Sequence, residues 1–186
     1  APSATTMANT LFLAHYDCSG VDADFAVGGR IAVGNGGTID ATAKFGAGSL
    51  DGYTASGTVS YYTAGNFNKS AGTVEMWIKP TNWSDGQYAG FFDVYEPGVG
   101  DIRLQKTSGG QLQAYMADLA PGGSSWSLTS SALSLNNNWH HIAWSWDVNA
   151  NMAALYVDGA VVANTPSGTV AYTGTLPVTF EIASIQ

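Results

Sequence analysis

Two adjacent histidines, His140 and His141, stand in the aromatic segment WHHIAWSWD at residues 139–147. Histidine is a common zinc ligand, and a zinc site needs three or four converging ligands. The segment alternates in the manner of a β-strand, so neighbouring side chains point to opposite faces and cannot hold one ion together. The chain has one other histidine, His15. We therefore expect one histidine to be hydrogen-bonded beneath a loop while the tryptophans pack in the core.

Nucleophilic catalysis finds little support in the sequence. Serine is abundant, but no serine stands in the G-x-S-x-G pattern that marks a nucleophile elbow. The single cysteine, Cys18, has no Lys or Arg beside it to activate the thiol, and it has no partner in the chain for a disulfide. A serine or cysteine hydrolase is therefore not expected.

The charge and the hydropathy of the chain each argue against one class of partner. The 186 residues include 14 acidic and 6 basic ones, which gives a net charge of −8. No basic stripe is present to neutralise phosphates, so nucleic acid is not expected as a partner. No apolar run approaches the roughly 20 residues that a membrane span needs, so membrane insertion is not expected either.

Short strands must position the remaining polar residues. Segments rich in apolar and aromatic residues recur between glycine- and asparagine-rich turns, and none has a sustained period of 3.6 residues. This pattern predicts an all-β, two-sheet antiparallel sandwich of the jelly-roll kind. We expect residues 1–9 to be a flexible lead-in and residues 10–186 to form a single domain. The predicted strands include residues 10–17, 72–80, 88–97, 101–107, 111–118, 138–147, 152–164 and 178–185.

Four of these segments separate an apolar set of side chains from a polar or aromatic set. Residues two apart on a strand share a face, so Ile102 and Leu104, for example, oppose Arg103 and Gln105. If the four segments lie in one sheet, their polar and aromatic sets share one outer face. The residues predicted for that face are Glu75, Trp77, Asp93, Tyr95, Arg103, Gln105, Gln113 and Tyr115.

Four motifs along the chain resemble those of concanavalin A-like, laminin G-type jelly rolls, and they occur in the family's order. The motifs are TLFLAHYDCSG, AKFGAGSLDGY, GTVEMWIKP and NNNWHHIAWSWD followed by LYVDG. The resemblance implies two antiparallel sheets, one of them curved into a concave face. It also implies the settings in which such domains occur: bacterial cell surfaces, modules of carbohydrate-active enzymes, and bacteriophage virions.

One departure from the family concerns the C-terminal segment FEIASIQ. It resembles the penultimate strand of the family, whose members continue with a further strand. The resemblance therefore predicts an unpaired edge, filled by more of the chain or by another polypeptide that adds a strand.

Some relatives with this fold are glucanases, which carry acidic residues in an E-x-D-x-x-E arrangement on one strand. Here Glu75 is followed by Trp77 where those enzymes have an aspartate. Asp93 on another strand is then the remaining partner for Glu75, and the two carboxyls would have to stand roughly 5–9 Å apart. The departure from the pattern argues against a glycan-cleaving enzyme.

The resemblance further implies a structural calcium ion bound partly by an early aspartate, which corresponds to Asp17. Asp22 and Asp24 follow closely and carry the oxygen ligands that calcium prefers. The alternative is that these aspartates only form turns. No cofactor is required by any motif.

The sequence therefore predicts a non-catalytic recognition module that binds a glycan at an extracellular, cell-surface or virion-surface location. Aromatic rings on the predicted face would stack on sugar rings, and Asp, Gln and Arg side chains would hydrogen-bond the hydroxyls. Two alternatives remain open: a structural or decoration component of a virus-like particle with contacts between protein subunits, and a glycan-cleaving enzyme.

Overall fold

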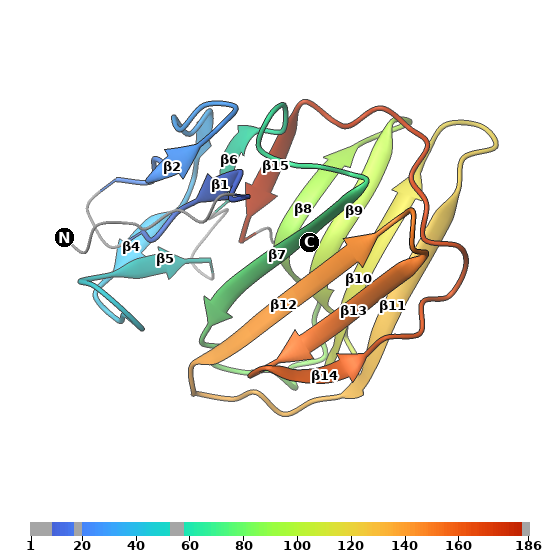
Figure 1. Ribbon diagram of the computed structural model, residues 1–186. Coiled ribbons are helices and arrows are strands. Elements are labelled where there is room, and N and C mark those ends of the chain that lie inside the picture. The colour runs from blue at the N-terminus through green and yellow to red at the C-terminus, as the bar shows by residue number, and fades with distance from the viewer. Residues whose placement is uncertain (1–8, 17–19, 53–57, 184–186) are drawn as a thin grey trace.

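The computed structural model describes residues 9–16, 20–52 and 58–183, and within them the chain forms strands, turns and loops (Figure 1). None of these residues forms a helix of the length and hydropathy that could cross a membrane. The strands are β1 (Phe12–Leu13), β2 (Phe25–Ala26), β3 (Gly34–Asn35), β4 (Thr38–Asp40), β5 (Ser49–Asp51), β6 (Val59–Tyr62), β7 (Ala71–Ile78), β8 (Ala89–Glu96), β9 (Gly100–Lys106), β10 (Gln111–Asp118), β11 (Ser125–Ala132), β12 (His140–Asp147), β13 (Met152–Val157), β14 (Ala160–Ala163) and β15 (Thr179–Ile182).

Two antiparallel sheets face each other and make up the body of the fold. The larger has seven strands in the order β11-β10-β9-β8-β15-β6-β3, and the smaller has four in the order β14-β13-β12-β7. Figure 1 shows the four-stranded sheet in front of the seven-stranded one. Two small pairs, β1-β2 and β4-β5, lie at the side. The prediction of an all-β, two-sheet sandwich is confirmed.

The core lies between the two sheets. Ile102 and Leu104 of β9 are fully buried, as alternation predicts for one face of that strand. Trp144 of β12 is also fully buried, and its ring meets that of Trp126 from β11 at 5.9 Å, edge to face, across the sandwich. Trp144 and Trp146 of the histidine segment are therefore core residues, as expected, whereas Trp139 is only partly buried.

The histidines of that segment diverge, which agrees with the argument against zinc. The His140 Nδ1 lies 2.7 Å from the Asp158 Oδ2, in the turn between β13 and β14. Asp158 and Gly159 both have positive φ, 50° and 80°, which is the geometry of a tight Asp-Gly hairpin turn. His141 lies on the outer face, where the centroid of its ring is 5.4 Å from that of the Trp77 ring.

The prediction that all four polar-faced segments share one sheet is wrong for β7. This strand pairs with β12, with Trp77 opposite His141 and Glu75 opposite Ala143. Alternation tells which side chains share a face of one strand, but it does not tell to which sheet the strand belongs. Residues 79–88 carry the chain from the four-stranded sheet to β8 in the other sheet, so Glu75 lies on the outside of the opposite layer.

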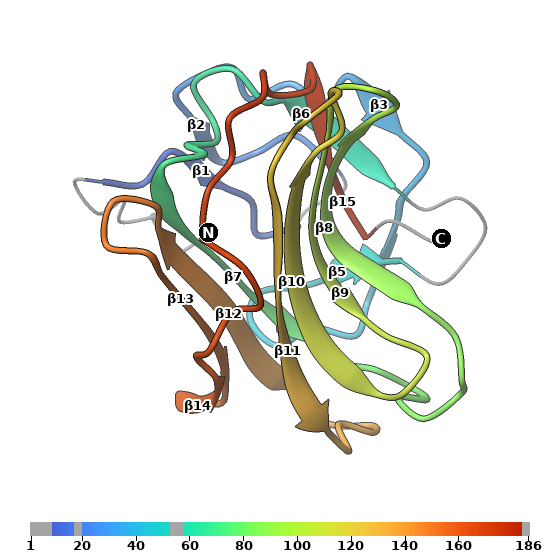
Figure 2. The ribbon, with the colours of Figure 1, turned by 90° about the vertical axis from the view of Figure 1, so that its right-hand side faces the viewer.

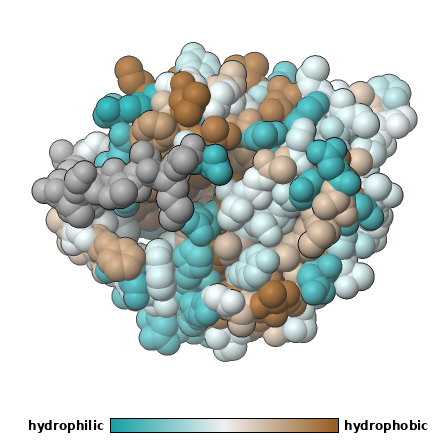
Figure 3. Space-filling model, in the orientation of Figure 1, coloured by the Kyte–Doolittle hydropathy of each residue, from teal (hydrophilic) through white to brown (hydrophobic). Residues whose placement is uncertain are grey.

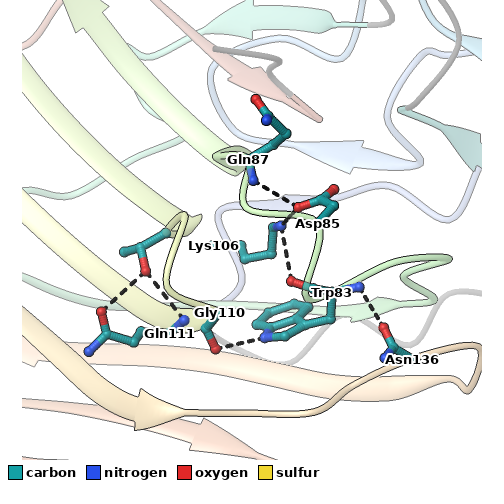
Figure 4. A network of polar contacts seen from close by, with 8 residues as sticks. Trp83, Asp85, Gln87, Lys106, Gly110, Gln111 and Asn136 are labelled. Carbon is teal, nitrogen blue, oxygen red and sulfur yellow. Dashed lines mark hydrogen bonds and ion pairs between the residues drawn. The ribbon is translucent and has the colours of Figure 1, made fainter.

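A buried polar cluster fastens the loops at one end of the sandwich (Figure 4). The Trp83 side chain is fully buried, and its Nε1 donates to the Gly110 carbonyl at 2.7 Å. The Lys106 Nζ donates to the Trp83 carbonyl at 3.0 Å and pairs with the Asp85 carboxylate. These bonds tie the loop before β8 to the β9-β10 hairpin and so hold the strands that carry the site.

The C-terminal strand of the described chain, β15, lies inside the seven-stranded sheet. It pairs with β6 on one side and with β8 on the other, with Glu181 opposite both Ser60 and Asp93. This strand is therefore not itself an edge.

Candidate functional site

The outer face of the seven-stranded sheet is hollowed. In Figure 2 the long strands β8 to β11 bow, and their concave side turns away from β7, β12 and β13. A shallow hollow of about 240 Å³ lies on this side. Its lining residues are Asp101, Arg103, Gln105, Gln113, Tyr115 and Ser127. We call this outer surface of β15, β8, β9, β10 and β11 the concave face.

One row of directly paired residues crosses the concave face. Glu181 of β15 is opposite Asp93 of β8, which is opposite Arg103 of β9. The row continues through Tyr115 of β10 to Ser127 of β11. Directly opposed residues in antiparallel strands bring their side chains into contact range on one face. The row therefore places two carboxylates, a guanidinium, a phenol and a hydroxyl side by side.

Arg103 is the centre of this row. Its Nε donates to the Asp101 carboxylate and lies 3.8 Å from the Asp93 Oδ1. Its guanidinium also lies over the Tyr95 ring, 5.3 Å from the centroid. Because three side chains hold it, Arg103 has a defined orientation, and a ligand would meet a fixed group instead of a freely moving one.

A second row consists of amide and hydroxyl groups. The Gln105 Nε2 donates to the Gln113 Oε1 at 2.7 Å, and the Gln113 Nε2 donates to the Thr129 Oγ1 at 2.9 Å. Gln105 is only 6% exposed. The chain of hydrogen bonds fixes the orientation of both amides, because each donates in one defined direction.

Burial shifts the titration of several groups on the concave face. It raises the pKa of Glu181, and the charge of Asp93 raises it further. Burial also raises the pKa of Asp101, an effect that the hydrogen bond and charge of Arg103 oppose. The pKa of Tyr115 is raised by burial and by the Asp101 charge. The Tyr115 phenol therefore stays protonated at neutral pH and can donate a hydrogen bond.

The structure brings together six of the eight residues predicted for one face. Asp93 and Tyr95 come from β8, Arg103 and Gln105 from β9, and Gln113 and Tyr115 from β10. All six lie on the concave face, and four of them line the hollow.

Sequence reasoning missed Asp101, Ser127 and Glu181. Asp101 shares the alternation of Arg103 and could have been found from it. Ser127 lies in a serine-rich segment without a strand signal, and nothing in the sequence places Glu181 beside Asp93.

The other two predicted residues form a separate cluster on the outer side of the four-stranded sheet. Trp77 is 40% exposed, and its ring meets Phe45 edge to face at 5.9 Å. The Lys44 Nζ lies 4.2 Å from the Trp77 ring centroid, and the Glu75 Oε2 lies 3.5 Å from the His141 Nε2. These contacts attach the loop between β4 and β5 to β7. The carboxyls of Glu75 and Asp93 point from opposite sides of a two-layer sandwich, so they cannot flank one glycosidic bond.

The proposed calcium ligand Asp17 lies outside the described residues, so calcium stays a prediction. In the part of the chain that the structure describes, no group of three or more His, Cys, Asp or Glu side chains converges on a metal position. The neighbouring aspartates have protein partners: the Asp22 Oδ1 accepts from the Ala32 N–H at 2.9 Å, and the Asp24 Oδ2 accepts from the His15 N–H at 2.8 Å. Both carboxylates thus bind backbone N–H groups nine or ten residues away and connect separate segments of the chain.

Comparison with known families gives a match to the concanavalin A-like lectin/glucanases superfamily over residues 51–181. The chain belongs to this superfamily. The matched region contains β6 to β14 and most of β15, and it includes every residue of the concave face named above. No curated protein sequence matches the chain significantly.

Several solved structures resemble the chain at low sequence identity. A glycoside hydrolase family 16 endo-glucanase from Bacteroides ovatus has 12% identity and a TM-score of 0.53, over 95% of this chain and 81% of that one. Domains LG4-5 of the mouse laminin α1 chain have 13% identity and a TM-score of 0.46, over 61% of this chain and 29% of that one. The CBM40 of a Ruminococcus gnavus sialidase, bound to α2,3 sialyllactose, has 16% identity and a TM-score of 0.42, over 63% and 78%.

The chain thus spans less than a third of the laminin chain that it matches.

Proposed function

We propose that this protein is a non-catalytic recognition module that binds a glycan on the concave face. The observation that carries the proposal is the hollow of about 240 Å³, in which the half-buried Tyr115 ring stands beside oriented amide and guanidinium groups. The superfamily to which the chain belongs is named after lectins and glucanases, two classes of protein that bind sugars, and this supports a sugar as the ligand.

The chemistry of the hollow suits a pyranose ring. Sugar rings have apolar C–H faces that pack on aromatic rings, and their hydroxyls both donate and accept hydrogen bonds. Tyr95 is half exposed and Tyr115 borders the hollow, so both rings are accessible. Gln113 and Arg103 are held by neighbouring side chains, so binding would cost little of their conformational entropy. The volume lies below the usual range of enclosed ligand pockets, which favours contact with a short stretch of a longer glycan.

The location and the partners follow from this proposal. A module that recognises polysaccharide would act outside the cell, on a cell surface or on a virion surface. The ligand is then a glycan or cell-surface polysaccharide. Calcium, if bound, would have a structural role.

The experiment that tests the proposal is glycan-array binding followed by titration calorimetry with the best ligand. Tyr115→Ala should weaken binding by about tenfold, because stacking of this kind contributes on the order of 1 kcal/mol. Trp77→Ala is the matched control: it removes an exposed aromatic ring from a strand of the other sheet and should leave binding unchanged. Equal loss in both variants, or no glycan bound at all, would contradict the proposal.

A second function, as a structural component of a larger particle, is favoured by one observation. Figure 3 shows exposed apolar side chains gathered on the side of the molecule where β2, β6 and β15 lie. In the chain segments next to these strands, Val27, Ile31, Val33 and Val178 have exposed side chains. An exposed apolar patch is a common feature of protein contact surfaces. Light scattering after size exclusion tests this directly: a stable oligomer that Ile31→Ser and Val178→Ser dissociate would support the particle, and a monomer at high concentration would contradict it.

A further inference from the structure

The concave face carries more acidic than basic groups. Asp93, Asp101 and Glu181 all belong to it. Among the described residues, Arg103 is the basic side chain of this surface, since Lys106 points to the loops at the end of the sandwich and pairs there with Asp85. The whole chain is also acidic, with a net charge of −8. A ligand that approaches the hollow therefore meets a negative potential.

Arg103, whose guanidinium is the basic group of this face among the described residues, is already engaged. Arg103 donates to Asp101, lies 3.8 Å from the Asp93 carboxylate and covers the Tyr95 ring. A carboxylate or sulfate on a ligand could pair with Arg103 only in competition with these aspartates. Asp93 is 6% exposed, so a ligand that drew Arg103 away would remove a basic neighbour from a buried carboxylate, which is costly.

Several hydrogen-bonding groups at the hollow are acceptors, so they need donors as partners. The Gln105 side chain is more than nine-tenths buried, and its Oε1 lacks a hydrogen-bond partner among the described residues. Its Nε2 is already committed to Gln113. The unpaired group of this side chain is therefore an acceptor, and the Asp101 carboxylate oxygens at the lining of the hollow are acceptors too. Hydroxyl, amide N–H and ammonium groups satisfy acceptors, whereas carboxylate and sulfate groups cannot.

We propose, on the basis of the glycan site above, that the concave face selects neutral glycans and rejects those that carry carboxylate, sulfate or phosphate groups. Sugar hydroxyls donate to the Asp101 carboxylate, and the half-buried Tyr115 ring packs against the apolar side of the same sugar. Because the pKa values of Glu181 and Asp101 are raised, both carboxyls take up protons at a higher pH than ordinary carboxyls do. The preference for neutral over acidic glycans should therefore weaken in mild acid.

The test compares the neutral and the acidic form of the same glycan backbone. The probes are cellohexaose, laminarihexaose, mannohexaose and xylohexaose, together with the first three after oxidation of C6 to carboxylate. Binding is measured by calorimetry at 20 mM and at 500 mM salt. We expect the neutral form to bind at least about tenfold more tightly at low salt. This difference in affinity should narrow at high salt, because salt shortens the range of repulsion between exposed charges to a few ångströms.

Matched variants identify which carboxylates of the protein weaken the binding of the oxidised glycan. Glu181→Gln and Asp101→Asn each remove one negative charge from the concave face at nearly constant volume, and each should improve binding of the oxidised glycan severalfold. Glu75→Gln removes the same charge from the outer side of the other sheet and should change neither affinity. Thermal unfolding of each variant shows whether it is folded.

Three outcomes separate this inference from the proposed function. Preference for the neutral form, relaxed in Glu181→Gln and not in Glu75→Gln, supports the inference. Equal or tighter binding of the oxidised form, lost in Tyr115→Ala, overturns it and leaves the glycan site in place. Binding of neither form, nor of any glycan on a broad array, overturns the proposed function and the inference together.

Discussion

Asp93 and Glu181 oppose each other directly across β8 and β15, with both carboxyls on the concave face. Like charges in directly opposed positions of a sheet destabilise it. The structure limits the cost in two ways: Arg103 lies beside Asp93, and Ser60 hydrogen-bonds Glu181. A pair of this kind is easier to understand on a surface that serves binding than on one that serves stability alone.

Glu181→Gln should raise stability at neutral pH and lose that advantage in acid. The folded-state pKa of Glu181 is raised, so the folded protein binds more protons than the unfolded one above the ordinary value of 4.5. The stability of the wild type therefore falls as the pH rises from about 4.5 through the folded-state pKa, and Gln cannot show this fall. We expect a gain of a few tenths to about 1 kcal/mol at pH 8.

The measurement is a series of urea unfolding curves between pH 4 and pH 8. Glu75→Gln is the control, since its carboxylate is exposed and lies on the other sheet. A stability difference between Glu181→Gln and wild type that does not change with pH would show that charge is not the cause.

The strands with regular alternation could be predicted almost to the residue. The segment 111–118 was expected to be a strand, and β10 has the same bounds, because Leu112, Ala114 and Met116 mark its buried face. The first predicted strand, 10–17, is reduced to the two residues of β1, because only β2 pairs with it in the described chain. The length of a strand at the side of a fold depends on its partner, which local sequence does not show.

Strand β11 gave too weak a signal to be recognised. Its outward positions are serine and threonine, and only Trp126 and Leu128 mark its inner face. Two apolar residues in a serine-rich segment do not distinguish a strand from a loop.

The sequence predicts which side chains of one strand or hairpin share a face. It does not predict which strands belong to the same sheet. Alternation placed Arg103, Gln113 and Tyr115 on a common face because β9 and β10 form a short hairpin, whose register is local. It misplaced Trp77, because the crossing from β7 to β8 depends on long-range packing. It also missed Glu181, which pairs with Asp93 only after the chain has formed β9 to β11 and three strands of the other sheet, β12 to β14.

Lys106→Met should destabilise the end of the sandwich that supports the β9-β10 hairpin. Methionine keeps the apolar stem of this buried residue but removes the ammonium that donates to the Trp83 carbonyl and pairs with the Asp85 carboxylate. We expect a loss of about 1–3 kcal/mol, the usual cost of an unsatisfied polar group. Lys79→Met, at an exposed position, should cost almost nothing.

The effect of Lys106→Met should also depend on pH. The hydrogen bond from Lys106 is the main cause of the lowered pKa of Asp85, whose ordinary value is 3.8. A lowered folded-state pKa contributes stability above the ordinary value, and this contribution is lost as the pH falls through the folded-state pKa. The gap between wild type and Lys106→Met should therefore narrow below about pH 4 in thermal unfolding. A gap that widens there would contradict the assigned role of the pair.

Gln113→Ala should weaken glycan binding more than it weakens the fold. The change removes the acceptor of the Gln105 Nε2 and the donor to Thr129, so the buried Gln105 amide can rotate. We expect a loss of about fivefold to tenfold in affinity and a cost of about 1 kcal/mol in unfolding free energy. Thr129→Val, which removes only the exposed end of the same row, is the control and should affect binding less. Equal effects of the two variants would show that the orientation of Gln105 does not matter.

The non-catalytic proposal makes its own prediction for the carboxyl pair of the concave face. Asp93 and Glu181 are close enough in the sheet to be compared with the carboxyl pairs of retaining glycosidases, which stand about 5–5.5 Å apart. Asp93 is 6% exposed and lies against Arg103, however, so its oxygens are recessed from any sugar that rests on Tyr115. A bound glycan should therefore stay intact, without release of reducing ends, and Glu181→Gln should bind a neutral glycan as the wild type does. Reducing ends released by the wild type, and lost in both Glu181→Gln and Asp93→Asn, would instead make the concave face an active site.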